Sequence, residues 1–257
     1  MALSDLLFKA LYRASQMFGT PNLSFDWTVY KLDPAERMRL AAESSDGIGK
    51  LFYAHHGRPI VKWIHYLDIY ERHFAPYRNT PVRMLEIGVF MGGSLDLWRE
   101  YFGADASICG IDLDPECTNR VTPPNQVRIG SQADAKFLRS VVDELGPPNI
   151  ILDDAAHIGR LQVASFDALF PLLQEGGLYV IEDLSTSYWH GIYEGGYRRK
   201  GTGIEFIKQM IDDMHAWYHN KSTRTPAKEQ IGAIHIYDSI VVIEKRKIKP
   251  PAYIKLK

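Results

Sequence analysis

The sequence has little of several features that would place a chain in a special class of protein. Only two cysteines, Cys109 and Cys117, occur among the 257 residues, so a disulfide framework is not expected, and Cys109 falls inside an expected strand as a buried thiol. No apolar run approaches the ~20 residues that a membrane-spanning helix needs. The formal net charge is only -1, so nothing global indicates a nucleic acid or membrane insertion.

What is present is an ordinary globular composition, with 46% hydrophobic and 24% charged residues. Near the N-terminus Leu3, Leu6, Leu7 and Leu11 fall close to one face of a helix, which we interpret as packing or a subunit contact in preference to a membrane-surface helix. Charges interrupt this stretch, so it is not typical of a signal peptide. We therefore expect a cytoplasmic protein that forms a homo-oligomer.

From residue 82 onward, short apolar runs alternate with helical patterns. This alternation, closed by two strand-like runs within 233–245, predicts an α/β fold: a doubly wound, mostly parallel Rossmann-like sheet with a C-terminal antiparallel hairpin. Residues 1–80 are expected to form a helical N-terminal extension and lid, and residues 81–257 the main domain. The aromatic segment 62–74 is expected to be a helix, either packed on the sheet or covering the ligand site. The expected strands are 82–89, 106–111, 126–129, 150–152 and 178–181, and the helices between and after them are 91–101, 134–144, 161–173 and 203–219.

Carboxylates follow two of the expected strands where each strand ends. Asp153 and Asp154 close the run 150–152, and Glu182 and Asp183 close the run 178–181. Because the carboxyl ends of parallel strands form the ligand-binding edge of such sheets, these side chains should meet there. Clustered carboxylates repel one another, and a hard cation with oxygen ligands compensates the repulsion. We expect Asp153 to point away from its neighbour, since adjacent strand residues face opposite sides.

A histidine lies beside this expected cation site. His157 follows Asp154 by three residues, at the mouth of the site. A histidine with a reference pKa near ~6.5 can accept a proton at physiological pH. A surface or capping histidine is the commoner fate of a lone histidine, but the neighbouring carboxylates favour a general base.

The turn after the first strand of the domain carries a second candidate site. It contains Glu86, Gly88, Gly92 and Ser94, and this spacing differs from the G-x-G-x-x-G motif that binds a pyrophosphate. An acidic residue before the first glycine suits a cationic ligand, and Asp112 at the end of the next strand can accept ribose hydroxyls. Together they indicate S-adenosylmethionine (SAM), although a tight structural turn alone explains the glycines almost as often.

Four motifs in this order, LEIGVFMGGS, GIDLDP, LDDAAH and EDLSTSYW, resemble the class I, SAM-dependent and magnesium-dependent sugar O-methyltransferase group. That group includes the mycinamicin-type 2''-O-methyltransferases, the cephalosporin-hydroxylase-like proteins and the rhamnosyl O-methyltransferases, and the resemblance covers residues 50–245. It implies a SAM-dependent methyltransferase domain over 81–257, with Mg²⁺ as the cation and Mn²⁺ as a substitute. It also implies that Asp154, Glu182 and Asp183 are the metal ligands and His157 the base. Further candidate cofactor contacts are Ser131, Gln132 and Asp154.

The expected function is therefore O-methylation of a sugar hydroxyl of a glycoside, oligosaccharide or natural product. Tyr188 and Trp189 lie on a glycine-rich loop after the second carboxylate pair, where aromatic faces suit a sugar; a surface loop without a binding role is the alternative. Two other functions stay open. One is O-methylation of a catechol-like diol by the same metal chemistry, and the other is a non-catalytic binding member of the fold.

Overall fold

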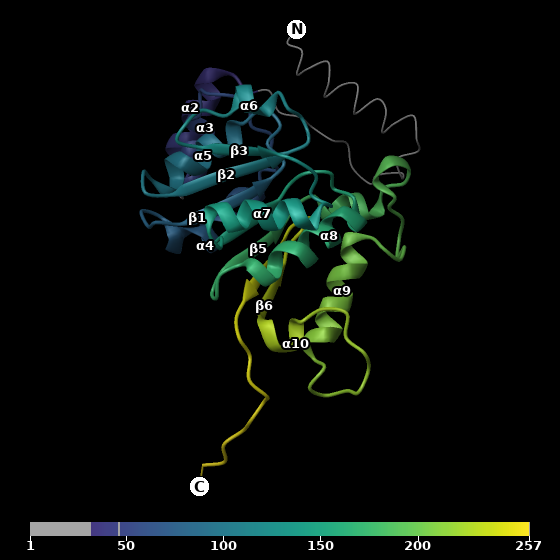
Figure 1. The fold of residues 1–257 in the computed structure, drawn as a ribbon. Coiled ribbons are helices and arrows are strands. Elements are labelled where there is room, and N and C mark those ends of the chain that lie inside the picture. Colours follow the sequence, from purple (N-terminus) through teal and green to yellow (C-terminus); the bar gives the residue numbers. More distant parts are fainter. Residues whose placement is uncertain (1–31, 46, 257) are drawn as a thin grey trace.

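A computed structural model describes residues 32–45 and 47–256 of the chain (Figure 1). The expected N-terminal helix over Leu3–Tyr12 lies outside the described residues. The centre is a seven-stranded sheet in the order β3-β2-β1-β4-β5-β7-β6, which confirms the expected fold class. Its strands are β1 (Arg83–Ile87), β2 (Ser107–Asp112), β3 (Gln126–Ile129), β4 (Ile150–Asp153), β5 (Leu178–Ile181), β6 (Ile231–Ile236) and β7 (Val241–Lys245).

The first five strands are parallel, and the C-terminal hairpin supplies the two antiparallel pairs. The strand β7 pairs with β5 and β6 on its two sides, so the reversed strand lies inside the sheet and β6 forms the edge. The strands from β1 to β5 are short, and β4 and β5 are buried along their whole length, as expected for parallel strands covered on both faces.

Helices cover both faces of the sheet and divide the core into two layers. One layer contains side chains from α3, α4 and α5, and the other contains side chains from α7, α8 and α9; α7 and α8 lie in front of the sheet in Figure 1. The helices and short 3₁₀ turns are α2 (Pro34–Glu43), α3 (Gly47–Ala54), α4 (Tyr66–Phe74), η1 (Ala75–Tyr77), α5 (Gly93–Phe102), α6 (Cys117–Arg120), α7 (Ala135–Leu145), α8 (Gly159–Leu169), η2 (Phe170–Leu172), η3 (Leu184–Tyr188), η4 (Gly191–Tyr193), α9 (Gly203–Met214) and α10 (Ala227–Gln230).

Residue alternation along the strands assigns side chains to the two layers. In β1, Met84 packs into the layer with α4 and α5, whereas Leu85 and Ile87 pack into the layer with α7 and α8. Glu86 shares the face of Met84 because side chains on a strand repeat every two residues. A carboxylate is therefore delivered into an otherwise apolar layer.

Local sequence signals explain several helix ends. Asp33 caps α2, with Pro34 in its first turn, and Asp134 caps α7 by accepting hydrogen bonds from two backbone amides. Thr202 caps α9 in the same way. Within the described ranges, no helix is both long and apolar enough to cross a bilayer.

The predicted helix over 62–74 is wrong at its start, because α4 begins at Tyr66. Residues 59–63 are neither helix nor strand. The irregular backbone has a physical cause, since Lys62 and Trp63 turn toward the sheet and reach the carboxylates at its edge. We call residues 59–65 the strap, and it leads directly into α4.

Candidate active site

Strand register brings the predicted carboxylates together. Asp153 pairs with Ile87 of β1 on one side and with Ile181 of β5 on the other. The residues that follow these positions, Asp154 and Glu182, therefore leave the sheet side by side at its carboxyl edge. The structure thus assembles the residues that the sequence placed at two separate strand ends.

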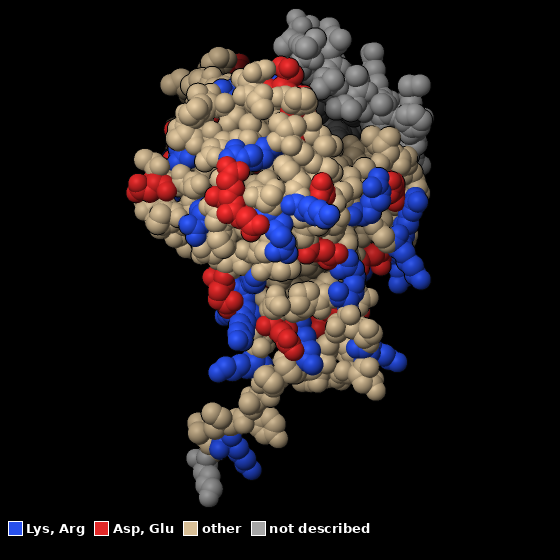
Figure 2. Space-filling model, viewed as in Figure 1, with Lys and Arg blue, Asp and Glu red and all other residues tan. Residues whose placement is uncertain are grey.

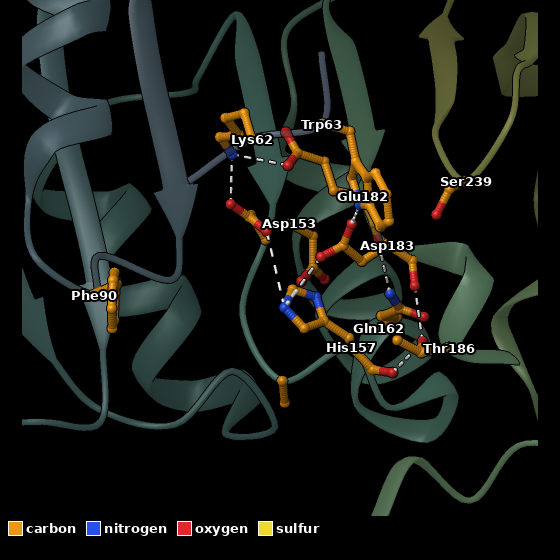
Figure 3. A network of polar contacts seen from close by, with 12 residues as sticks. Lys62, Trp63, Phe90, Asp153, His157, Gln162, Glu182, Asp183, Thr186 and Ser239 are labelled. Atoms are coloured by element: carbon orange, nitrogen blue, oxygen red, sulfur yellow. Dashed lines mark hydrogen bonds and ion pairs between the residues drawn. The ribbon is translucent and has the colours of Figure 1, made fainter. Parts of the chain in front are cut away.

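Three side chains form the tightest group at this edge. Asp154, His157 and Asp183 each offer one ligand atom, and these atoms all lie within 4.8 Å of one another. The Nε2 atom of His157 is 3.5 Å from Asp183 Oδ2 and 4.0 Å from Asp154 Oδ1. Figure 3 shows the imidazole of His157 beneath the carboxylate of Asp183. All three are partly exposed, so a ligand can reach them from solvent.

A lysine that the sequence did not single out lies in the middle of the carboxylates. The Nζ atom of Lys62 is 2.5 Å from Asp154 Oδ2, 2.8 Å from Glu182 Oε2 and 4.0 Å from Glu86 Oε1. Its side chain is only 3% exposed, and Figure 3 shows it pointing at Glu182. Burial opposes the charged form of Lys62, but the three carboxylates outweigh burial, so the pKa of Lys62 lies above its ordinary value.

Glu182 is buried, unlike the other two predicted metal ligands. Its Oε2 accepts a hydrogen bond from Lys62, and its Oε1 accepts one from the Tyr70 hydroxyl at 2.5 Å. Burial, reinforced by the charge of Asp154, raises the pKa of Glu182 above its ordinary value. Its role as a metal ligand stays a prediction, and with both oxygens engaged it stands outside the compact group of Asp154, His157 and Asp183.

Asp183 is held by the strap and by α4. Its Oδ1 accepts hydrogen bonds from Trp63 Nε1 at 2.8 Å and from the Tyr66 hydroxyl at 3.0 Å. The backbone of Asp183 is in the left-handed region with φ 55°, which is uncommon for a residue other than glycine. These two donors leave Oδ2 free to face His157 and fix the carboxylate in that orientation.

His157 also has a left-handed backbone, with φ 53°. Thr186 holds its carbonyl by donating a hydrogen bond at 2.7 Å, and the same hydroxyl also lies 2.8 Å from the carbonyl of Asp183. The Nδ1 atom is buried and has no hydrogen-bond partner among the described residues. The imidazole is therefore aimed at the carboxylates through Nε2, by a backbone conformation that is locked to the loop after β5.

Asp153 points to the opposite side of the sheet, as predicted from strand alternation. Its partners are two side chains: the hydroxyl of Ser165 on α8 and the amide of Gln132 donate to it. Burial raises the pKa of Asp153 to about 6, although Ser165 opposes the shift. Gln132 is itself buried, and its Oε1 accepts from the amide of Ala156. It therefore braces the loop that carries His157.

The turn after β1 is more tightly packed than a ligand-binding role for Gly88 requires. A Cβ atom at Gly88 would lie 2.1 Å from the carbonyl oxygen of Asp154, and its φ is +101°. The glycine is thus needed because two loops touch at this point, and a contact of Gly88 with the cofactor stays a prediction. Gly92, with φ +81°, precedes α5 as its N-terminal cap residue. Ser94 donates to Glu86 at 3.0 Å.

Glu86 is a fully buried acid with one unsatisfied oxygen. Its Oε1 has no hydrogen-bond partner among the described residues, and the side chain is 0% exposed. Burial raises the pKa of Glu86 to about 7, although the charge of Lys62 pulls in the other direction. An unsatisfied buried oxygen at the edge of the site is consistent with a missing positively charged or hydrogen-bonding ligand.

Asp112 binds the loop that should cradle the cofactor. Its Oδ2 accepts from the amides of Val89 and Phe90, and its Oδ1 accepts from the amide of Asp114. Burial would raise its pKa, but these amides outweigh burial and lower it. Phe90, whose amide donates to Asp112, and Leu113, the next residue in the chain, are 41% and 69% exposed. A carboxylate between two exposed apolar side chains is a reasonable place for a nucleoside.

The remaining predicted contacts lie on two loops. The Ser131 hydroxyl accepts from the amide of Ala133 and shapes the turn before α7. Tyr188 is 42% exposed at the end of η3, whereas the Trp189 ring lies 5.3 Å from that of Tyr193. The loop that carries them is folded into two short 3₁₀ turns, η3 and η4. Their role with a substrate stays a prediction.

Sequence reasoning missed the donors that surround the carboxylates. Lys62, Trp63, Tyr66 and Tyr70 come from the strap and α4 and contact Asp154, Glu182 or Asp183. The two tyrosines are four residues apart and so share one helix face. That face was visible in the sequence, but a Tyr–x–x–x–Tyr stripe is more often part of a core than of a site.

Comparison with known proteins agrees with the resemblance drawn from the motifs. The 8-demethyl-8-alpha-L-rhamnosyl tetracenomycin-C 2'-O-methyltransferase of Streptomyces olivaceus is 37% identical over 227 residues, which are 82% of this chain and 58% of that protein. The mycinamicin VI 2''-O-methyltransferase of Micromonospora griseorubida is 37% identical over 194 residues, or 68% of this chain and 47% of that protein. The chain is homologous to the sugar O-methyltransferases. The resemblance drawn from the motifs is confirmed.

A solved structure agrees with this relationship. A methyltransferase of the mycinamycin biosynthetic pathway, in complex with Mg, SAH and mycinamycin VI, has a TM-score of 0.68 and 31% sequence identity to this chain. The match covers 84% of this chain and 54% of that one. The chain thus spans about half to three fifths of the length of these methyltransferase relatives. No family model matches the chain.

Proposed function

We propose that the chain is a SAM-dependent, divalent-cation-dependent O-methyltransferase that methylates a sugar hydroxyl of a glycosylated small molecule. The observation that carries the proposal is the group of Asp154, His157 and Asp183, whose ligand atoms lie within 4.8 Å of one another at the carboxyl edge of the sheet. The relatives named for sugar O-methylation support the substrate class.

The residues present fit both absent groups. Three carboxylates, Glu86, Asp154 and Glu182, gather around Lys62, and a fourth, Asp183, lies beside His157, so the site has an excess of acidic groups that a divalent cation with oxygen ligands would compensate. The unsatisfied Oε1 of Glu86 and the exposed side chains beside Asp112 fit a cationic nucleoside such as SAM. When bound, SAM supplies an electrophilic methyl group and Mg²⁺ makes a nearby hydroxyl more acidic.

The residues of the chain then have separate tasks in methyl transfer. Asp154 and Asp183 would hold the cation, with Glu182 as the third predicted ligand, and the cation would make the acceptor hydroxyl more acidic. His157 takes the proton of that hydroxyl at Nε2 while the new O–C bond forms and the S–C bond breaks. Because Trp63 and Tyr66 fix Asp183, the Oδ2 atom of Asp183 keeps its position relative to the base His157.

The loop after β5 is assigned to the substrate because it lies beside this edge. Tyr188 and Trp189 follow Asp183 on the loop of η3 and η4, where an aromatic surface can contact a sugar ring. Lysine and arginine residues intermix with acidic ones on the face shown in Figure 2. The predicted homo-oligomer and the lid role of the N-terminal extension stay predictions.

The direct test is product analysis by mass spectrometry. The chain is incubated with SAM and Mg²⁺ and with two acceptor panels, one of rhamnosides and other deoxysugar glycosides and one of catechols. Addition of one methyl group to a glycoside, lost in chelator and in His157→Ala, supports the proposal. His219→Ala is the matched control, because His219 is exposed and its ring contacts the backbone of Asp212 and Lys221, away from the carboxylates.

Two other outcomes would reject parts of it. Methylation of catechols alone would replace the sugar substrate with an aromatic diol. If calorimetry detected no SAM binding and neither panel gained a methyl group, the chain would be a non-catalytic member of the fold.

A further inference from the structure

Lys62 occupies the position that the proposed function assigns to a divalent cation. Its ammonium group contacts Asp154 Oδ2 at 2.5 Å and Glu182 Oε2 at 2.8 Å, and both residues are predicted metal ligands. A lysine is almost never buried to 3% exposure unless carboxylates pair with it. The chain therefore carries its own cation for this site.

We propose that Lys62 is an internal counter-cation, which a divalent cation displaces from Asp154 and Glu182 while Trp63 of the strap stays on Asp183. This inference rests on the proposed function for the identity of the incoming cation. It adds an exchange between two cations, and it makes the position of the Lys62 side chain depend on metal binding.

Both cations cannot use the same oxygens at once. Mg²⁺ binds carboxylate oxygens at about 2.0–2.1 Å and demands a nearly octahedral shell. An ammonium nitrogen held 2.5 and 2.8 Å from those oxygens would stand within the shell and repel the metal at close range in a buried site. Binding through Asp154 and Glu182 therefore requires Lys62 to leave, after which Glu182 can act as the third ligand.

The strap is built so that Lys62 can leave without unfolding its neighbours. Its first residues pack against the start of α5, where a Cβ atom on Gly93 would lie 2.5 Å from the carbonyl of Pro59. Its last residues lead into α4. Between these two anchors the backbone is neither helix nor strand, and Val61 and Ile64 are 58% and 55% exposed. Ile60 and Trp63 of the strap pack against the core layer that contains α4 and α5, so the exchange requires only the Lys62 side chain to move.

Acylation of lysine side chains in the wild-type chain tests the exchange directly. The chain is treated with an amine-reactive ester in chelator or in saturating MgCl₂ at matched ionic strength, and labelled peptides are quantified by mass spectrometry. Lys62 should be protected in chelator and become reactive in Mg²⁺, while the exposed Lys50 and Lys136 react equally in both. Calorimetry confirms that Mg²⁺ has bound.

A variant pair tests competition. Lys62→Met removes the charge and keeps the length, so it should bind Mg²⁺ more tightly. The apparent affinity for Mg²⁺ should rise about tenfold if, in the wild type, Lys62 is away from the carboxylates in about a tenth of the molecules. Lys62→Arg keeps a competing charge and should bind Mg²⁺ no more tightly than the wild type. The wild-type labelling result stands even if Lys62→Met does not fold.

Three results would overturn the proposal. Lys62 that stays protected while Mg²⁺ is bound would show that the metal binds beside the lysine. Binding of Mg²⁺ to Lys62→Met but not to the wild type would make the lysine a permanent substitute for the metal. No binding to either would remove the exchange altogether. Methyl transfer is measured in none of these arms, so inactivity toward every glycoside would count against the proposed function only.

Discussion

Replacing Glu86 by glutamine should make the fold less sensitive to pH. Glu86 is 0% exposed, and burial raises its pKa to about 7 from an ordinary value of 4.5. A carboxyl group with a raised pKa in the folded state favours folding while it is protonated. Its stabilising contribution is complete below pH 4.5 and is lost as the pH rises through about 7. Above that pH the protein must keep a buried negative charge, which the unfolded chain would expose to water.

The size of the effect follows from the shift. Each pKa unit corresponds to about 1.4 kcal/mol, so the shift amounts to about 3 kcal/mol in total. Most of it, roughly 2 to 3 kcal/mol, falls between pH 5 and pH 8. Glu86→Gln is neutral at both pH values, so its free energy of unfolding relative to the wild type should rise by roughly this amount. The lost contact with Lys62 and the new amide change both values by a pH-independent offset.

Urea unfolding at pH 5, 6, 7 and 8 measures this difference. The control is Glu100→Gln, an exposed residue of α5, whose difference from the wild type should stay flat. A Glu86→Gln difference that is equally flat would mean that Glu86 stays ionised in the folded protein at pH 5. The reasoning from burial would then fail, and Lys62 would be compensating its charge more fully than the pKa of Glu86 implies.

Three other predictions can be checked independently. His157→Ala should still bind SAM in calorimetry but lose ~10²- to 10⁴-fold of the methyl-transfer rate, because it removes a general base; turnover close to that of the wild type would reassign His157 as structural. Asp134→Ala should lower the free energy of unfolding by ~1 kcal/mol in urea titration, since two amides of α7 lose their cap, and an unchanged midpoint would contradict the capping role. Burial raises the pKa of Cys109 to about 12 and that of Cys117 to about 11. A thiol-reactive dye at pH 8 should therefore label neither until the protein unfolds, and rapid labelling of the native protein would argue against the packing described.

The strands and the catalytic edge were predictable because their signals are local. The apolar run before Asp153 and Asp154 has the length of a buried strand, and strand alternation alone predicts that the two aspartates face opposite sides. The resemblance then assigned Asp154 and His157 their roles without any tertiary information. The C-terminal hairpin was also predictable from the sequence. That its second strand, β7, pairs with β5 was not, because the alternation of residues along a strand does not specify which strands pair.

The surroundings of the carboxylates could not be predicted in this way. Lys62 lies 92 residues before Asp154 and 120 before Glu182 in the chain. No periodicity connects positions so far apart. The helical pattern over 62–74 was instead misleading at its start, because pairing Lys62 and Trp63 with the carboxylates of the sheet edge stabilises more than one extra turn of helix would.

The placement of Lys62 has a consequence for how the strap and the sheet depend on each other. Glu182 and Lys62 are both buried, and removing one partner of a buried ion pair leaves an uncompensated charge that costs several kcal/mol. The carboxyl edge of the sheet therefore requires either the strap or an external cation. Trp63 and Tyr66 donate to Asp183, and Tyr70 donates to Glu182, so the segment 62–70 is part of the site and more than a cover above it. The negative charge of this edge is compensated either by Lys62 of the strap or by a bound metal. The edge can therefore stay folded before the metal binds, and the same carboxylates determine both its stability and its proposed chemistry.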